Sequence, residues 1–150
     1  MSNSEVQNLI LDTTHSNKEH KKLIRDLIGR PYSFWESLKM GGVGSKRMII
    51  EQVSPNMNKY LNKISDINYA NIEMRSDGIL IYINKGLKNY TWVIPYYQLV
   101  IYKSDGTSIH SQGKFIRFKK NRTFKENAAF IKKLFSAKVN YDKRFEFQGL

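Results

Sequence analysis

The chain has 150 residues, contains no cysteine and carries a formal net charge of +12; hydrophobic residues make up 41% of it and aromatic residues 13%. These values predict one folded domain and exclude a disordered chain. The lack of cysteine excludes disulfides, thiolate nucleophiles and cysteine-ligated metal centres. The N-terminus lacks the basic and apolar regions of a signal peptide, and no apolar stretch is long enough to cross a membrane. We therefore expect a cytoplasmic protein.

The N-terminal part of the chain is predicted to be helical. The apolar residues 9–11 indicate a short helix that begins at about residue 4. A second helix is predicted to begin at Ser16–Glu19 and to end at Gly29. Ser16–Glu19 is a capping box, in which the serine and glutamate side chains bond backbone N–H groups of the first turn. Ser33–Glu36 repeats that pattern and predicts a third, short helix, which ends at the glycine pair that follows.

The next segment leads from these helices into the rest of the domain. The glycine-rich residues 41–45 predict a flexible hinge between two halves of the chain. Residues 47–53 suit either a buried strand or a helix. Ser54 followed by Pro55 is typical of a helix start, and a helix is predicted to follow as far as about residue 64.

From residue 68 the apolar residues alternate with a period of two, which predicts an antiparallel β-meander over about 68–120. Pro95 interrupts the meander and predicts a bend, and Ile109–Lys120 is predicted as its last strand. A capping box at Thr123–Glu126 predicts the start of a C-terminal amphipathic helix. Turns are predicted at Asp77-Gly78, Lys85-Gly86 and Asp105-Gly106.

Three runs of the meander, Trp92–Tyr97, Leu99–Tyr102 and Phe115–Lys120, lead into that C-terminal helix. With the helix, they give residues 69–138 a resemblance to the C-terminal half of bacterial PH-like domains, in which a strand meander ends in one helix that plugs the barrel. The resemblance implies a partial PH-like barrel. It also implies a binding or adaptor module for phospholipid headgroups, peptides or protein surfaces.

The positive charge is concentrated near the C-terminus. Residues 111–150 hold eleven Lys or Arg and three Asp or Glu, a balance of +8. Such a cluster can neutralise phosphates and release counterions, so it predicts an anion- or nucleic-acid-binding site; the alternative is a solvated basic face. The predicted site residues are Lys114, Arg117, Lys119, Lys120, Arg122, Lys125, Lys132 and Lys133.

Aromatic residues near this charge suggest base stacking. Phe115 shares a strand face with Arg117, and Tyr97 lies in an aromatic-rich strand pair, so both are candidates to stack on unpaired bases. The alternative is packing inside the protein. We predict packing for Trp92, and likewise for the Phe34-Trp35 pair.

No catalytic or metal-binding pattern stands out. The histidines lack the spacing of zinc helices, and Asp66, Glu73 and Arg75 lack the second acid of a metal-dependent nuclease. Residues 41–46 differ from a phosphate-binding loop in the order of Gly, Lys and Ser. We therefore predict no catalytic residue, no metal and no cofactor, and do not expect an enzyme.

These observations predict an α+β fold with a helical region over 1–42 and a sheet with a C-terminal helix over 43–150, together forming one compact domain. The predicted function is that of a non-enzymatic basic module that binds RNA, including a ribosomal surface, or DNA. One alternative is a PH-like adaptor for acidic lipid headgroups or a protein. Another is a structural subunit of a larger assembly.

Overall fold

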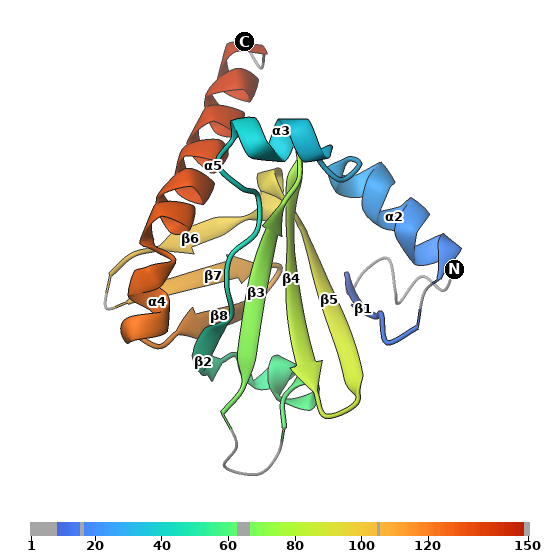
Figure 1. The fold of residues 1–150 in the computed structure, drawn as a ribbon, viewed down its shortest axis with the longest axis vertical. Helices are drawn as coiled ribbons and strands as arrows, with labels where there is room; N and C mark the ends of the chain where they lie inside the picture. The colour runs from blue at the N-terminus through green and yellow to red at the C-terminus, as the bar shows by residue number, and fades with distance from the viewer. Residues whose placement is uncertain (1–8, 16, 63–66, 105, 149–150) are drawn as a thin grey trace.

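The computed structural model describes residues 9–15, 17–62, 67–104 and 106–148. Within them the fold is α+β, as predicted, with one antiparallel sheet and helices at both ends of the chain (Figure 1). The strands are β1 (Ile10–Asp12), β2 (Met48–Val53), β3 (Tyr69–Met74), β4 (Gly78–Lys85), β5 (Lys88–Pro95), β6 (Val100–Tyr102), β7 (Thr107–Ser111) and β8 (Lys114–Phe118). The helices are α2 (Lys18–Ile28), α3 (Phe34–Lys39), α4 (Arg122–Glu126), α5 (Ala128–Gln148) and the 3-10 helices η1 (Pro55–Tyr60) and η2 (Tyr96–Gln98).

The sheet has the strand order β1-β5-β4-β3-β2-β8-β7-β6 and is not closed, because β1 and β6 remain as its edges. β2 belongs to both halves of the sheet: Met48 and Ile49 pair with β3, and the rest of the strand pairs with β8 across a register shift between Ile50 and Gln52. A bulge of this kind bends a strand. The β6–β8 half accordingly crosses β3–β5 at a steep angle (Figure 1).

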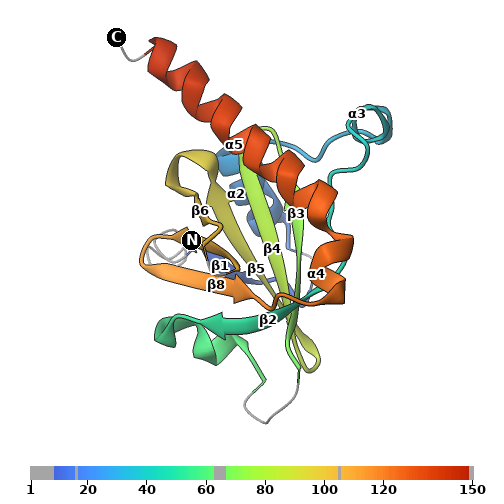
Figure 2. The same cartoon turned by 90° about the vertical axis from the view of Figure 1, so that its left-hand side faces the viewer.

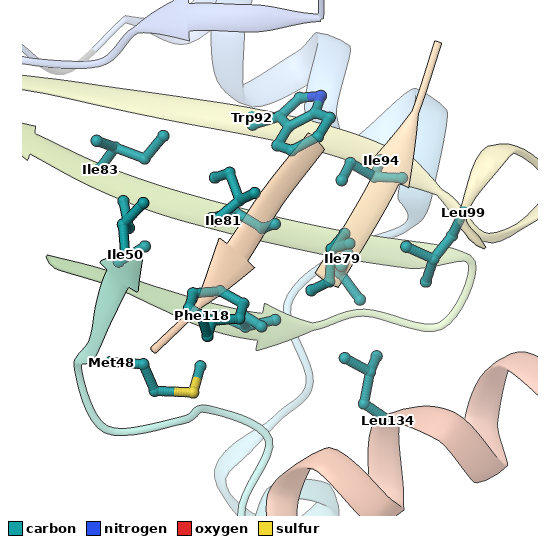
Figure 3. Packing of buried hydrophobic residues seen from close by; sticks show 14 of the residues in the cluster. Met48, Ile50, Ile79, Ile81, Ile83, Trp92, Ile94, Leu99, Phe118 and Leu134 are labelled. Carbon is teal, nitrogen blue, oxygen red and sulfur yellow. The ribbon is translucent and has the colours of Figure 1, made fainter. Parts of the chain in front are cut away.

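The main core lies on the inner side of this bent sheet. Ile79, Ile81 and Ile83 of β4 point into it from alternate positions and are fully buried (Figure 3). Trp92 is 1% exposed and lies in the same core, which confirms its predicted packing role. Leu134 of α5 packs against the core from the open side, so the C-terminal helix closes part of the space between the two halves.

A second apolar cluster lies on the outer side of the sheet, where α2 covers β4 and β5. Leu80 and Val93 point away from the main core and contact Leu23, Ile24 and Ile28 of α2. β1 extends the sheet beyond β5, and Leu9 and Leu11 of this stretch join the second cluster, whereas Ile10 belongs to the main core.

The N-terminal predictions need two corrections. Residues 10–12 form a strand instead of a helix, because their backbone groups pair with β5; the proposed helical residues before Leu9 lie outside the described part. The cap of α2 is Asn17, whose Oδ1 accepts from the backbone N–H of Glu19 and His20, in place of the predicted Ser16, which is not described. The capping box at Ser33 and Glu36 is confirmed.

The segment between α3 and β3 also differs from the expectation. Residues 48–53 form a strand, which answers the open question about this stretch, and the helix predicted after Ser54 is a 3-10 helix that ends at Tyr60. The predicted hinge is bound to the body of the protein. The Ser45 N–H donates to the Ile72 carbonyl over 2.8 Å, and Gly44 forms a bridge with Glu73.

Two further predictions near the C-terminus are wrong. Ile109–Lys120 is two strands joined by Gln112 and Gly113, which both have positive φ angles, of 54° and 75°. The helix after β8 is capped by Asn121 instead of Thr123, and it is interrupted at Asn127 before α5 begins. Asn127 is buried and fills this break, because its Nδ2 donates to the Thr123 carbonyl and its Oδ1 accepts from the Lys46 N–H.

In the described ranges, no helix has the length and apolar character needed to cross a lipid bilayer.

Candidate functional site

The outer face of the β6–β8 half differs from the face that α2 covers. In the described part of the chain, the buried residues of α2 and α5 belong to the two apolar clusters, while α3 and α4 bury none, so no helix covers this face. We call it the open face. Its outward side chains come from alternate positions of β2, β6, β7 and β8 and are Gln52, Val100, Tyr102, Ser108, His110, Phe115 and Arg117.

Three rings form a row across the open face. His110 pairs with Phe115 on the neighbouring strand, and their rings stack with centroids 5.1 Å apart. On its other side, His110 meets Tyr102 edge-on at 4.7 Å. Tyr102 is 51% exposed, and Val100 beside it is 45% exposed. A depression of about 390 Å³ borders the row at His110 and Phe115. The row therefore presents apolar ring surface to solvent.

Arg117 adds a cation beside this row. It lies next to Phe115 on the same strand face, and its Nη1 donates to Gln52 Oε1 over 3.3 Å. Burial and the Arg117 charge both lower the pKa of His110, burial having the larger effect. A ring nitrogen of His110 also shares a 2.9 Å hydrogen bond with the Ser108 hydroxyl. The lowered pKa of His110 favours its neutral ring, and Arg117 is the permanent charge on the open face.

The eight predicted basic residues do not form one patch. Lys114 lies at the start of β8, where partial burial and then the nearby Lys59 lower its pKa. Lys133 of α5 instead faces the glycine segment and donates to the carbonyls of Gly41 and Gly42 over 3.1 and 2.8 Å. Its charge holds α5 against that segment and is not available to a ligand in this arrangement.

A smaller group of basic side chains continues from the end of the open face. Lys119, Lys120, Arg122 and Lys125 are all exposed, and we call them the basic rim. They follow β8 directly and extend along α4, which packs on β2. Arg122 pairs with Glu126 at 3.5 Å, but its side chain remains 93% exposed. Lys132 is also exposed, further along α5.

The two predicted stacking residues lie in different places. Phe115 is part of the open face, whereas Tyr97 lies in η2 and lines a separate groove with Tyr141, Asp142 and Phe145. Tyr102 and His110 were not among the predicted site residues. Their contacts with Phe115 depend on the turn at Gln112 and Gly113 and on the register of β6, β7 and β8, which no local pattern specifies.

Acidic and histidine residues do not assemble a metal site in the described ranges: no group of three His, Asp or Glu side chains there lies close enough to hold an ion. Glu73 instead pairs with Arg75 at 2.6 Å, and Arg75 Nη1 donates to the Gly29 carbonyl over 3.0 Å. Asp66, the third member of that candidate group, lies outside the described residues. The Glu73–Arg75 pair therefore links the sheet to the end of α2.

Comparisons of the chain with protein-family models, curated proteins and solved structures found no match.

Proposed function

We propose that this protein is a non-enzymatic binding module that holds a single strand of nucleic acid, RNA in the first place, on the open face and the basic rim. One observation carries the proposal: the solvent-facing row of Tyr102, His110 and Phe115 lies beside Arg117 on an uncovered sheet face. Aromatic rings on a sheet accept unpaired bases, because every base has a flat face that can stack.

The basic rim supports the proposal through the backbone of the ligand. Lys119 and Lys120 follow Arg117 along the chain at the end of β8, and α4 adds two more cations. Cations that contact phosphates release counterions from the nucleic acid, which makes binding depend on salt. Rings for bases beside cations for phosphates are the combination used by proteins that bind single strands with little sequence preference.

The test compares two variants with the same loss of charge. The open-face variant carries Arg117→Ala, Lys119→Ala, Lys120→Ala and Arg122→Ala. The control removes four exposed cations from α2: Lys18, Lys21, Lys22 and Arg25. Affinity for a fluorescent single-stranded RNA is measured against salt concentration. The open-face variant should flatten the slope of log K against log salt by about 2 to 3, since each phosphate contact on a single strand contributes about 0.7.

The control variant should keep most of the wild-type slope. An equal loss of RNA affinity in both variants would mean that binding depends on the total charge of the protein. RNA affinity equal to wild type in the open-face variant would reject this site. Phe115→Ala separates stacking from charge, because it should weaken binding by about 1–3 kcal/mol and leave the slope unchanged.

A second candidate is the PH-like adaptor. The strands β2–β5 and β6–β8 follow one another, β2 pairs with β8, and α5 closes part of the core. This succession, in a sheet that is not closed, is the observation that favours the PH-like alternative. Liposome co-sedimentation that rises with anionic lipid, together with no affinity for RNA or DNA, would favour the adaptor.

A further inference from the structure

The short helix α3 exposes an apolar face that the fold does not use. Phe34, Trp35 and Leu38 are 74%, 70% and 60% exposed, and α3 buries no residue at all. At 3.6 residues per turn, Phe34, Trp35 and Leu38 lie within an arc of about 100° around the helix, which is one apolar face. The Phe34 and Trp35 rings contact each other at 5.4 Å. The prediction that these two residues pack inside the protein is therefore wrong.

The helix is nevertheless well formed at its start. The Ser33 hydroxyl accepts from the Glu36 N–H over 3.2 Å, and the Glu36 carboxylate accepts from the Ser33 N–H over 3.0 Å. Figure 2 shows α3 projecting from the body of the protein at the end of extended connections. A capped helix therefore displays two aromatic rings and a leucine away from the sheet.

More exposed rings lie at the same end of the molecule. Tyr97 of η2 is 65% exposed and Phe145 of α5 is 47% exposed. They line an open groove of about 680 Å³ together with Tyr141. Figure 1 shows α3 and the C-terminal half of α5 at the same end of the molecule, and Figure 2 shows that they extend from it toward opposite sides. We call the side chains Phe34, Trp35, Leu38, Tyr97 and Phe145 the aromatic end.

The charges around the aromatic end favour an anionic partner. Three described carboxylates lie near these side chains, and each is paired with a cation of the protein. Glu36 pairs with Arg30 at 3.2 Å, Asp77 with Arg144 at 3.7 Å, and Asp142 with Lys138 at 2.9 Å. Lys39, at the end of α3, and Lys143 are exposed, and within the described residues neither forms an ion pair. The surface therefore offers cations next to apolar rings.

We infer that the aromatic end is a docking surface for an anionic lipid bilayer, with α3 entering the interface between headgroups and acyl chains. Trp, Phe and Leu on an exposed helix are the side chains that enter this interface, and Lys or Arg beside them is attracted to acidic headgroups. A second copy of the chain fits less well, because it would bring together two molecules that each carry a net charge of +12. The inference goes beyond the nucleic-acid proposal and uses none of the open-face or rim residues.

The two tryptophans provide a direct test. Trp35 is 70% exposed and Trp92 is 1% exposed, so a change in Trp35 surroundings is read against a buried, constant Trp92 signal. The full chain is mixed with phosphatidylcholine vesicles that either contain or lack phosphatidylglycerol. The expected result is a blue shift of emission and protection from acrylamide only with the anionic vesicles. Trp35→Phe should abolish the shift.

Variants of α3 test which residues carry the binding. Phe34→Ser with Leu38→Ser keeps the Trp35 reporter and, because α3 buries no residue, should leave the fold intact; circular dichroism checks this. Partitioning into anionic vesicles should fall by roughly tenfold or more, as expected for losing two apolar side chains from the interface. The matched control is Leu87→Ser, which removes a 96% exposed leucine in the β4–β5 turn, at the far end from α3 in Figure 1.

Three results would overturn the inference. These are wild-type partitioning of the Phe34/Leu38 variant, equal binding to neutral vesicles, and a blue shift that grows with protein concentration when no vesicles are present. The last result would identify a second copy as the occupant. The open-face variant distinguishes this inference from the nucleic-acid proposal, because it should lose RNA binding and keep the Trp35 shift.

Discussion

The two outer faces of the sheet meet solvent in different ways. On the β4–β5 side, Leu80 and Val93 are 1% and 0% exposed because α2 lies over them. On the β6–β8 side the outward residues are rings, polar groups and the aliphatic Val100, and Tyr102 is half exposed. Both faces belong to one continuous sheet that shares one inner core. The difference lies only in the side chains that alternate outward.

This difference separates residues that stabilise the fold from residues that are free to bind a partner. A face made of aliphatic residues must be covered, so α2 is part of the stability of the domain. A face of rings, amide and guanidinium groups can remain in water without such a cover. Substitutions on the face under α2 should therefore lower stability, whereas substitutions on the open face should lower binding.

The largest effect is expected at the covered face. Leu80→Ala removes a buried side chain under α2 and should lower the free energy of unfolding by about 2–5 kcal/mol. Urea unfolding followed by circular dichroism measures the change. Val100→Ala on the open face is the matched control and should change stability by less than about 0.5 kcal/mol. A similar loss of unfolding free energy in Leu80→Ala and Val100→Ala would contradict the difference in stability between the two faces.

A smaller effect is expected where α2 meets the sheet. A Cβ atom at Gly78 would contact Ile28 of α2 and would approach the Ile94 carbonyl oxygen to 2.5 Å. Gly78→Ala should therefore destabilise the fold by about 1–3 kcal/mol, the usual cost of overpacking. Gly86→Ala would meet no neighbour but has a φ of 59°, so it tests backbone strain without crowding. An equal melting temperature for Gly78→Ala and wild type would show that α2 is not closely packed against the sheet at Gly78.

A still smaller loss of stability is expected at Phe115. Its ring stacks on His110 but is partly exposed, so Phe115→Ala should cost about 1 kcal/mol of unfolding free energy. Chemical denaturation measures this value. A cost as large as that of Leu80→Ala would make Phe115 a structural residue and would weaken the case for the open face as a binding surface.

The smallest effect is a pH dependence at His110. Its pKa in the folded protein lies below the ordinary value of 6.5, so the unfolded chain takes up the proton first as the pH falls. The contribution of His110 to stability should therefore be fully present above its ordinary pKa and should decrease as the pH falls below that pKa. The groups that face this ring are Tyr102, Ser108, Phe115 and Arg117. Between about pH 7.5 and pH 5.5, the His110→Asn variant should lose less stability than wild type in urea titrations. Equal losses in the two proteins would contradict the lowered pKa of His110.

The meander was largely predictable because its signals are local. Ile79, Ile81 and Ile83 alternate in the sequence and are all buried, and the turn at Lys85-Gly86 joins β4 to β5 as expected. The turn at Gln112 was not predictable in the same way. Glutamine rarely adopts a positive φ, so Gln112 carries no turn signal, and an isolated glycine such as Gly113 inside a strand pattern is also typical of a bulge.

Other errors came from contacts between distant parts of the chain. Leu9 and Leu11 have the apolar character of a helix segment, yet the open edge of β5 pairs with this stretch and makes it a strand. For the candidate site, alternation placed Phe115 and Arg117 on one face. The contact between Phe115 and His110 depends on the register of β7 and β8, and the exposure of Trp35 depends on the position of α3 relative to the other described elements.

The shared strand β2 also has a consequence for how the chain is made. Met48 pairs with Ala70, 22 residues later, whereas Val53 pairs with Ile116, 63 residues later. A ribosome that adds about 5–20 residues per second needs several seconds to produce that second partner. During this interval the nascent chain can complete the β3 side of β2 but not its β8 side. The joint between the two halves of the sheet is therefore among the last to form, and the unpaired end of β2 must be kept from other nascent chains until then.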